Sequence, residues 1–242
     1  MTFCMLTVQH PFTSVSRALS DWYGVWLRGL PSLKKIAVFL LPVVFGLLLY
    51  HFFLSKPYPR IKNASPMGEN IICFGDNLTY GTGATRGMDY PSQLARMISI
   101  PVMNKGVPGD TTARALARLD QDVLSQSPLV VLITLGGNDL KNGVSRDIAF
   151  QNLKRIIKSI QATGALVIVG GIDLPFWGRG FGEGYGEVCS LTGAVLISNI
   201  LDGIIGNSKL MSDPIHPNDA GYTKVAERFL KALNPYLLAG TR

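Results

Sequence analysis

An α/β fold built on a parallel β-sheet with helices on both faces is the class predicted for residues 69–242. Two observations predict it. Short apolar runs alternate with longer helical segments along this part of the chain, as they do in chains of β-α-β units. Several of these runs are continuously apolar, which is typical of strands buried on both faces of a sheet.

The expected strands and helices alternate strictly along the chain. The strands are expected at Asn70–Phe74, Pro101–Asn104, Leu129–Leu135, Ala165–Gly170 and Ala194–Ile197. The helices are expected at Pro91–Ser99, Thr111–Ser125, Asp147–Thr163, Phe181–Thr192 and Asp219–Leu233. In sheets of this kind, functional groups gather at the carboxyl ends of the strands.

One long uncharged apolar segment precedes this region. Residues 36–54 read IAVFLLPVVFGLLLYHFFL, with Lys34, Lys35 and Lys56 at their flanks. A helix needs about 20 apolar residues to cross a bilayer, so the length fits. A buried core helix and a cleaved signal peptide are the alternatives. A core helix rarely avoids charge for so long, and the preceding segment is long for a signal peptide. The sequence therefore predicts a transmembrane helix at 36–54.

The segments on either side of the expected membrane helix differ in character. Residues 1–35 form a basic segment with apolar residues at helical spacing, either an amphipathic helix on the membrane surface or leader sequence. Residues 55–68 are expected to be a linker. Basic residues are slightly more numerous before the helix than after it, which indicates a cytoplasmic N-terminus. We therefore expect a single-pass, membrane-anchored protein with a periplasmic or otherwise extracytoplasmic globular domain.

The formal net charge of +7 does not indicate nucleic-acid binding. Residues 1–62 contain seven Lys or Arg and one acidic residue, so almost all of the excess flanks the apolar segment. The remainder of the chain is nearly neutral, and no basic patch interleaved with aromatic residues is found. The three cysteines form no CxxC or Cys/His cluster, so no metal site is predicted.

Four short polar segments follow expected strands or lie in the last loop. They span residues 75–79, 106–110, 136–139 and 213–217. The predicted topology brings them to one edge of the sheet. His216 is the only histidine in residues 69–242. Asp213, three residues earlier, can orient one ring nitrogen of His216 so that the other acts as a base. Taken alone, such a pair is usually a solvated loop feature.

Gly109 and Asn138 are candidates for a second role. A glycine in a tight loop exposes its backbone N–H, and an asparagine after Gly136-Gly137 can present a side-chain amide. Two such donors can stabilise an oxyanion. Ordinary turn chemistry is the alternative for either segment alone.

Taken together, the four segments resemble a known family. Gly-Asp-Asn-Leu-Thr at 75–79 resembles the GDSL block of the SGNH hydrolases, and Gly109, Asn138 and the Asp213–His216 pair match the remaining blocks in order. The resemblance covers about residues 69–235 and is nearest to bacterial lysophospholipase, thioesterase and arylesterase members. It implies a flavodoxin-like three-layer α/β/α sandwich with a five-stranded parallel sheet.

The resemblance also implies a chemistry. It implies hydrolysis of small acyl or aryl esters or thioesters by a serine nucleophile, with no cofactor or metal. His216 is then the base and Asp213 its partner, with Asn77, Gly109 and Asn138 as oxyanion-hole residues.

Asn77 departs from the family pattern, because it stands at the position of the nucleophilic serine. A carboxamide is a poor nucleophile, and loss of a triad nucleophile lowers kcat by roughly 10⁶-fold. We therefore expect this chain to be inactive or strongly impaired. Asn77 is either an engineered substitution, the mark of a natural inactive homologue, or a variant of an active parent. Thr79, two positions on, is expected to point elsewhere.

Two further alternatives stay open. The first is a non-catalytic acyl- or glycan-binding protein on the same fold. The second concerns Asp173–Phe181, whose aromatic side chains either line a substrate pocket or cover the core. A flavodoxin-like nucleotide binder is disfavoured, since no phosphate-binding glycine motif opens a helix. The sequence does not predict an oligomeric state.

Overall fold

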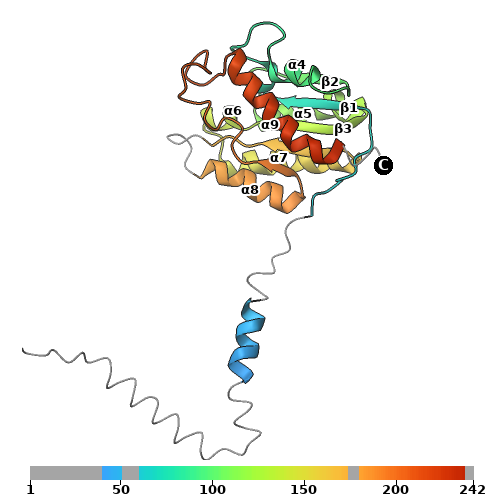
Figure 1. Ribbon diagram of the computed structural model, residues 1–242, viewed down its shortest axis with the longest axis vertical. Coiled ribbons are helices and arrows are strands. Elements are labelled where there is room, and N and C mark those ends of the chain that lie inside the picture. The colour runs from blue at the N-terminus through green and yellow to red at the C-terminus, as the bar shows by residue number, and fades with distance from the viewer. Residues whose placement is uncertain (1–39, 51–59, 174–179, 238–242) are drawn as a thin grey trace, which may run out of the picture. The chain divides into compact units, whose positions relative to one another are not determined.

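The structure is a computed structural model that describes residues 40–50, 60–173 and 180–237. The chain divides into two units, Met1–Tyr58 and Pro59–Arg242. In the first unit, residues 40–50 form a helix, drawn in blue in Figure 1. No helix within the described ranges is both long and apolar enough to cross a membrane. The expected transmembrane helix at 36–54 extends beyond this helix at both ends, and those ends and residues 1–35 lie outside the described residues.

The second unit contains a five-stranded parallel sheet, as predicted. Its strands are β1 (Asn70–Gly75), β2 (Val102–Gly106), β3 (Pro128–Thr134), β4 (Leu166–Gly170) and β5 (Val195–Ile197). They lie in the order β2-β1-β3-β4-β5, and every neighbouring pair is parallel. In this register Ile72 of β1 pairs with Met103 on one side and Val131 on the other.

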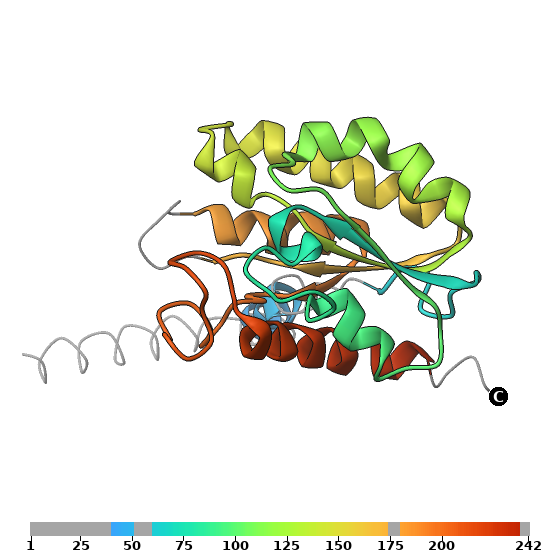
Figure 2. The same ribbon diagram turned by 90° about the horizontal axis from the view of Figure 1, so that it is seen from above.

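Helices cover both faces of the sheet, so the predicted three-layer arrangement is confirmed. On one face lie α4 (Tyr90–Ala95) and α9 (Asp219–Leu237). On the other lie α5 (Thr112–Asp122), α7 (Arg146–Ala162) and α8 (Phe181–Thr192). Figure 2 shows the two layers with the sheet between them, α5 and α7 above and α9 below.

The strand order places a crevice where the site is expected. The chain leaves β1 to form β2 on one side and then returns to form β3 on the other. Ligands of such sheets bind at this reversal point, beyond the carboxyl ends of the strands. Two short helices begin there, α3 (Asn77–Tyr80) after β1 and α6 (Gly137–Lys141) after β3. A short 3-10 helix, η1 (Leu124–Gln126), lies before β3.

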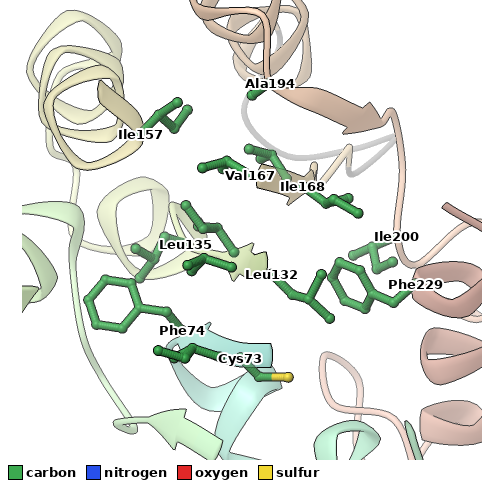
Figure 3. Packing of buried hydrophobic residues seen from close by; sticks show 14 of the residues in the cluster. Cys73, Phe74, Leu132, Leu135, Ile157, Val167, Ile168, Ala194, Ile200 and Phe229 are labelled. Carbon is green, nitrogen blue, oxygen red and sulfur yellow. The ribbon is translucent and has the colours of Figure 1, made fainter. Parts of the chain in front are cut away.

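The core follows from the apolar strands. Residues 71–74, 130–133 and 166–169 are fully buried, and each buried Val, Leu, Ile or Phe side chain contributes ~1.5–3 kcal/mol. Figure 3 shows Phe229 of α9 beside Ile200, on the side of the sheet away from Ile157 of α7. Cys73 and Cys189 are both buried and unpaired, as expected of thiols that serve as core side chains.

The described part of the expected linker, residues 60–68, lies within the second unit and is hydrogen-bonded to the rest of it. Asn63 donates through Nδ2 to the carbonyl oxygens of Gln161 (2.9 Å) and Ala165 (2.8 Å). The Lys62 N–H donates to the carbonyl of Gly193 at 2.9 Å. These hydrogen bonds fix the course of residues 60–68, which lead into β1.

Candidate active site

The turn between β1 and α3 positions the first site residue. β1 ends at Gly75, and the Asp76 carboxylate accepts a hydrogen bond from the Leu78 N–H at 3.2 Å, which caps α3. A Cβ on Gly106 of β2 would collide with the backbone of Thr79 and Tyr80. Glycine at 106 therefore lets α3 lie directly against the strand ends, with Asn77 at its first position.

The side-chain oxygen of Asn77 lies between the two expected oxyanion donors. Oδ1 accepts from the Gly109 N–H at 2.8 Å and from Asn138 Nδ2 at 3.1 Å. Asn138 Nδ2 also lies 3.0 Å from the carbonyl oxygen of Asp110 and 3.2 Å from Asp76 Oδ2. All three partners of Nδ2 are acceptors, so the orientation of the Asn138 amide is set. Gly109 has a φ of +81°, a left-handed conformation that favours glycine.

His216 and Asp213 form the expected pair. His216 Nδ1 lies 2.7 Å from Asp213 Oδ2, and because an ionised carboxylate only accepts, Nδ1 is the donor. The other carboxylate oxygen accepts from the N–H groups of Ile215 (2.9 Å) and His216 (2.8 Å). Burial acts to raise the pKa of Asp213, but these hydrogen bonds outweigh it and hold that pKa below its usual value. The pair leaves Nε2 of His216 available for chemistry.

Asn77, Asn138 and His216 line one pocket of about 100 Å³. Its walls also include Lys141 and a set of apolar side chains, Leu78, Ile172, Leu201, Ile205 and Ile215. The structure thus brings together the site residues expected from the sequence, with Gly109 bonded to Asn77 at the edge of the group. Their catalytic roles stay predictions.

Asp76 is a site residue whose environment the sequence did not predict. Its side chain is almost fully buried and lines the same pocket. Burial raises its pKa to about 7, aided by the nearby Asp139 and Asp110 carboxylates and opposed by hydrogen bonds from backbone N–H groups. A carboxylate placed directly after a continuously apolar strand was the available signal for a buried, functionally placed acid.

Arg118 of α5 contacts the end of β1 and the loop after β2, beneath the site. Its Nε lies 2.6 Å from Asp110 Oδ2, and its Nη2 donates to the carbonyl of Gly75 at 3.0 Å. The guanidinium also stacks over the ring of Phe74, 4.4 Å from its centroid. One side chain therefore ties the end of β1 to the loop that carries Gly109.

Two other expected features lie away from the reaction centre. Thr79 is fully buried, with Oγ1 3.0 Å from the Tyr90 hydroxyl and 2.5 Å from the Thr134 hydroxyl, so it does not replace a nucleophile at 77. Phe181 packs against Phe150 and Tyr185 in the core. Residues 174–179 of the aromatic loop lie outside the described residues.

In the described ranges, no group of three or more His, Cys, Asp or Glu is placed to hold a metal ion.

Comparison with known proteins gives a consistent result. The chain is 29% identical to the esterase TesA of Pseudomonas aeruginosa over 180 residues, covering 70% of this chain and 90% of TesA. It is 27% identical to thioesterase 1/protease 1/lysophospholipase L1 of Escherichia coli K12, covering 69% of this chain and 84% of that protein. The crystal structure of TesA superposes with a TM-score of 0.66, covering 69% of this chain and 99% of that one.

The family assignment rests on more than pairwise similarity. Residues 73–224 match the family described as GDSL-like lipase/acylhydrolase. This match spans more than half of the chain and includes all of the site residues described above. The chain therefore belongs to the GDSL-like lipase/acylhydrolase family.

Proposed function

We propose that the chain carries the site of an SGNH-type esterase or thioesterase for small acyl or aryl esters or thioesters, and that Asn77 leaves it inactive or strongly impaired. The observation that carries this proposal is the shared pocket. Two hydrogen-bond donors, Gly109 N–H and Asn138 Nδ2, converge on one oxygen atom, while His216 lines the same pocket with its Nδ1 held by Asp213.

This geometry supports a stepwise acyl transfer when a hydroxyl is present at position 77. His216 Nε2 accepts the hydroxyl proton as the oxygen attacks the ester carbonyl carbon. The carbonyl oxygen becomes an oxyanion on the Gly109 and Asn138 donors, each of which contributes ~3–4 kcal/mol when well placed. His216 then protonates the leaving group, and water repeats the sequence to release the acid. Asp213 holds the imidazole and stabilises its charged form.

Asn77 impairs this sequence in two ways. Its carboxamide has no hydroxyl for His216 to deprotonate. Its Oδ1 also occupies the donors on which a substrate carbonyl would rest. A substrate must therefore displace the Asn77 side chain and replace two hydrogen bonds, each of which contributes ~0.5–1.5 kcal/mol net.

The pocket supports small substrates with an apolar portion. Its volume of about 100 Å³ and its five apolar lining residues suit a short acyl or aryl group. The esterase and thioesterase names of the relatives agree with this chemistry. The proposed reaction uses no cofactor and no metal, since every step is assigned to groups of this chain and to water.

A second candidate is a non-catalytic acyl- or glycan-binding protein on the same fold. The occupancy of both donors by Asn77 favours it, because a binder has no use for a vacant oxyanion hole. The intact Asp213–His216 pair favours the esterase, because a binder has no use for an oriented imidazole. These candidates differ in whether restoring a serine restores turnover.

We further propose that residues 36–54 anchor the protein in a membrane and that the family domain is periplasmic or otherwise extracytoplasmic. The uncharged length of this segment and the lysines at its flanks support an anchor. The test compares the full chain with a chain that begins at Pro59. The full chain should partition into detergent and the shortened chain into buffer; a full chain that remains in buffer without detergent would exclude the anchor.

Esterase chemistry is tested with a nitrophenyl acetate substrate and three proteins: the chain with Asn77, Asn77→Ser, and Asn77→Ser combined with His216→Ala. The serine variant should exceed the Asn77 chain by several orders of magnitude, within the roughly 10⁶-fold range of triad nucleophiles. The double variant should lose nearly all of this gain. A serine variant that stays inactive while correctly folded would favour the binding protein.

A further inference from the structure

The side chain of Asn77 is held as an amide substrate would be held. In acyl transfer, the carbonyl oxygen under attack rests on the oxyanion donors. Here that oxygen is Oδ1 of Asn77, 2.8 Å from the Gly109 nitrogen and 3.1 Å from Asn138 Nδ2. The backbone N–H of Gly109 can only donate, so the oxygen and not the nitrogen of the Asn77 amide must face it.

The remaining parts of a hydrolytic site surround this amide. His216 lines the same pocket, and Asp213 holds its Nδ1 so that Nε2 is the free nitrogen. The pocket volume of about 100 Å³ exceeds the roughly 30 Å³ that one water occupies in the liquid. Among the described residues, Asn77 Nδ2 makes no hydrogen bond to protein, so no such bond opposes its departure.

We propose that this site hydrolyses the side-chain amide of its own Asn77, which converts the residue to aspartate and releases ammonia. The proposal rests on the proposed function, because it uses the same base and the same oxyanion donors. It adds a self-modification site whose substrate is a primary carboxamide within the chain.

Each atom in the reaction is accounted for. His216 Nε2 takes a proton from water as the water oxygen bonds to Cγ of Asn77, and Oδ1 becomes an oxyanion on the two donors. The C–N bond then breaks, and the leaving nitrogen takes the proton from His216 and departs as ammonia. The new carboxylic acid ionises to a carboxylate and its proton yields ammonium. One water is consumed, and no oxidant, reductant or cofactor takes part.

The ordinary route of asparagine deamidation is obstructed at this position. That route needs the backbone nitrogen of the next residue to attack Cγ and form a cyclic imide. The N–H of Leu78 instead donates to the Asp76 carboxylate at 3.2 Å, within the first turn of α3. The two routes also differ in product, since the cyclic imide opens to a mixture of aspartate and isoaspartate, whereas direct attack by water yields aspartate alone.

The chain contains its own reference for the uncatalysed rate. Asn142 is exposed and precedes Gly143, and an Asn-Gly pair is the sequence most prone to imide formation because glycine does not obstruct it. In the folded chain the Gly143 N–H donates to the Leu140 carbonyl at 3.2 Å, so imide formation at Asn142 should be fastest in the denatured chain. Conversion at Asn142 thus reports chemical ageing of the sample, while conversion at Asn77 reports the site.

The test follows both asparagines by peptide mass spectrometry while the purified full chain is incubated in buffer at neutral pH. We expect residue 77 to become aspartate with no isoaspartate, and unfolding in denaturant to stop this conversion while Asn142 continues to react. His216→Ala should slow conversion at 77 by at least ~100-fold, the lower range for a general base, and leave the rate at Asn142 unchanged. Asp213→Asn serves as a second variant that removes the orienting carboxylate, and it should slow conversion at 77 as well.

Three outcomes would overturn the proposal: an Asn77 that keeps its amide while Asn142 converts in the same sample or in a denatured sample incubated for the same time, an equal rate in the His216→Ala chain, or isoaspartate at 77. Failure here is separable from failure of the proposed function. If Asn77→Ser hydrolyses esters but Asn77 never converts, only the self-modification is wrong. If Asn77→Ser is also inactive, the hydrolytic site itself is wrong.

Discussion

The two sides of the candidate site differ in how the fold holds them. On the Asn77 side, Asp76 is only 3% exposed, and its neighbours lie on the ends of β1 and β3. On the His216 side, the Asp213 side chain is 44% exposed, and its loop is held mainly by its own bonds, including Ser212 N–H to the His216 carbonyl at 2.9 Å. The first side is part of the core and the second is a loop placed over it.

Because of this contrast, the pKa values of Asp76 and Asp213 shift in opposite directions. Burial raises the pKa of Asp76 to about 7, whereas hydrogen bonds outweigh burial at Asp213 and lower its pKa. Substitutions on the buried side should therefore change stability, and substitutions on the loop side should change catalysis with little effect on stability. The predictions below test this division.

The largest expected effect concerns catalysis on the loop side. In the Asn77→Ser background, His216→Ala should lower kcat by up to roughly 10⁶-fold, because nucleophile and base act as a unit. The His216 side chain is 16% exposed, so the free energy of unfolding should fall by only ~0.5–1.5 kcal/mol, the net contribution of its hydrogen bond to Asp213. Ester hydrolysis and urea denaturation measure the two quantities. A large loss of stability would show that the loop is part of the core.

The next effect is the pH dependence of stability due to Asp76. Its pKa rises from 3.8 to about 7 on folding, so the folded state binds the proton more tightly than the unfolded state does. The contribution of Asp76 to the free energy of unfolding is fully present below pH ~4. It is lost as the pH rises toward ~7, and the free energy of unfolding no longer changes through this group above that pH. The total change is about 4 kcal/mol, at ~1.36 kcal/mol for each pKa unit.

Asp76→Asn is the matched control, because it keeps a side-chain oxygen for the Leu78 N–H and has no proton to release. The difference in unfolding free energy between the unsubstituted chain and this variant should vary with pH across this window. A difference that is constant from pH 4 to 7 would contradict the buried, protonated state.

A smaller effect is expected at Arg118, beneath the site. Arg118→Met removes the closer of two cationic partners of the buried Asp110 side chain and leaves the exposed Arg114, whose Nε lies 3.4 Å from Asp110 Oδ1. Breaking a buried pair completely costs about 3–5 kcal/mol, and the remaining Arg114 contact should keep the loss below that range; chemical denaturation measures it. An Arg118→Met chain as stable as the unsubstituted chain would show that the network is not structural.

The smallest effect is expected at an exposed ion pair, which serves as the control for Arg118→Met. Lys224 and Glu227 form an exposed ion pair on α9, 3.0 Å apart. Lys224→Ala should change stability by less than ~1 kcal/mol, because exposed pairs contribute little. A loss comparable with that of Arg118→Met would remove the distinction between the two kinds of pair.

Much of this molecule could be predicted from its sequence, because several of its strands are continuously apolar. Such runs as Leu129–Leu135 and Ala165–Gly170 mark buried parallel strands, and the sheet order then brings the polar segments that follow them to one edge. The ends of elements were less predictable. The helix expected at Pro91–Ser99 is α4, Tyr90–Ala95, and α9 continues past the expected Leu233 to Leu237, through Pro235.

Tertiary contacts explain what the sequence could not predict. The occupancy of the oxyanion donors by Asn77 depends on a side-chain orientation set by Gly109 and Asn138, which are 32 and 61 positions away. The raised pKa of Asp76 depends on burial and on carboxylates from two other segments. No local pattern carries such information, since it arises only when the strand ends meet.

One measurement tests most directly whether this pocket is a hydrolytic site that lacks only its nucleophile. It is kcat/KM for nitrophenyl acetate with the Asn77 chain and with Asn77→Ser, together with labelling by a phosphonate inhibitor. We predict that the serine variant gains several orders of magnitude, and that the inhibitor labels its residue 77 and leaves the Asn77 chain unlabelled. Equal turnover by the two chains, with no label at position 77 in either, would contradict a serine mechanism at this site.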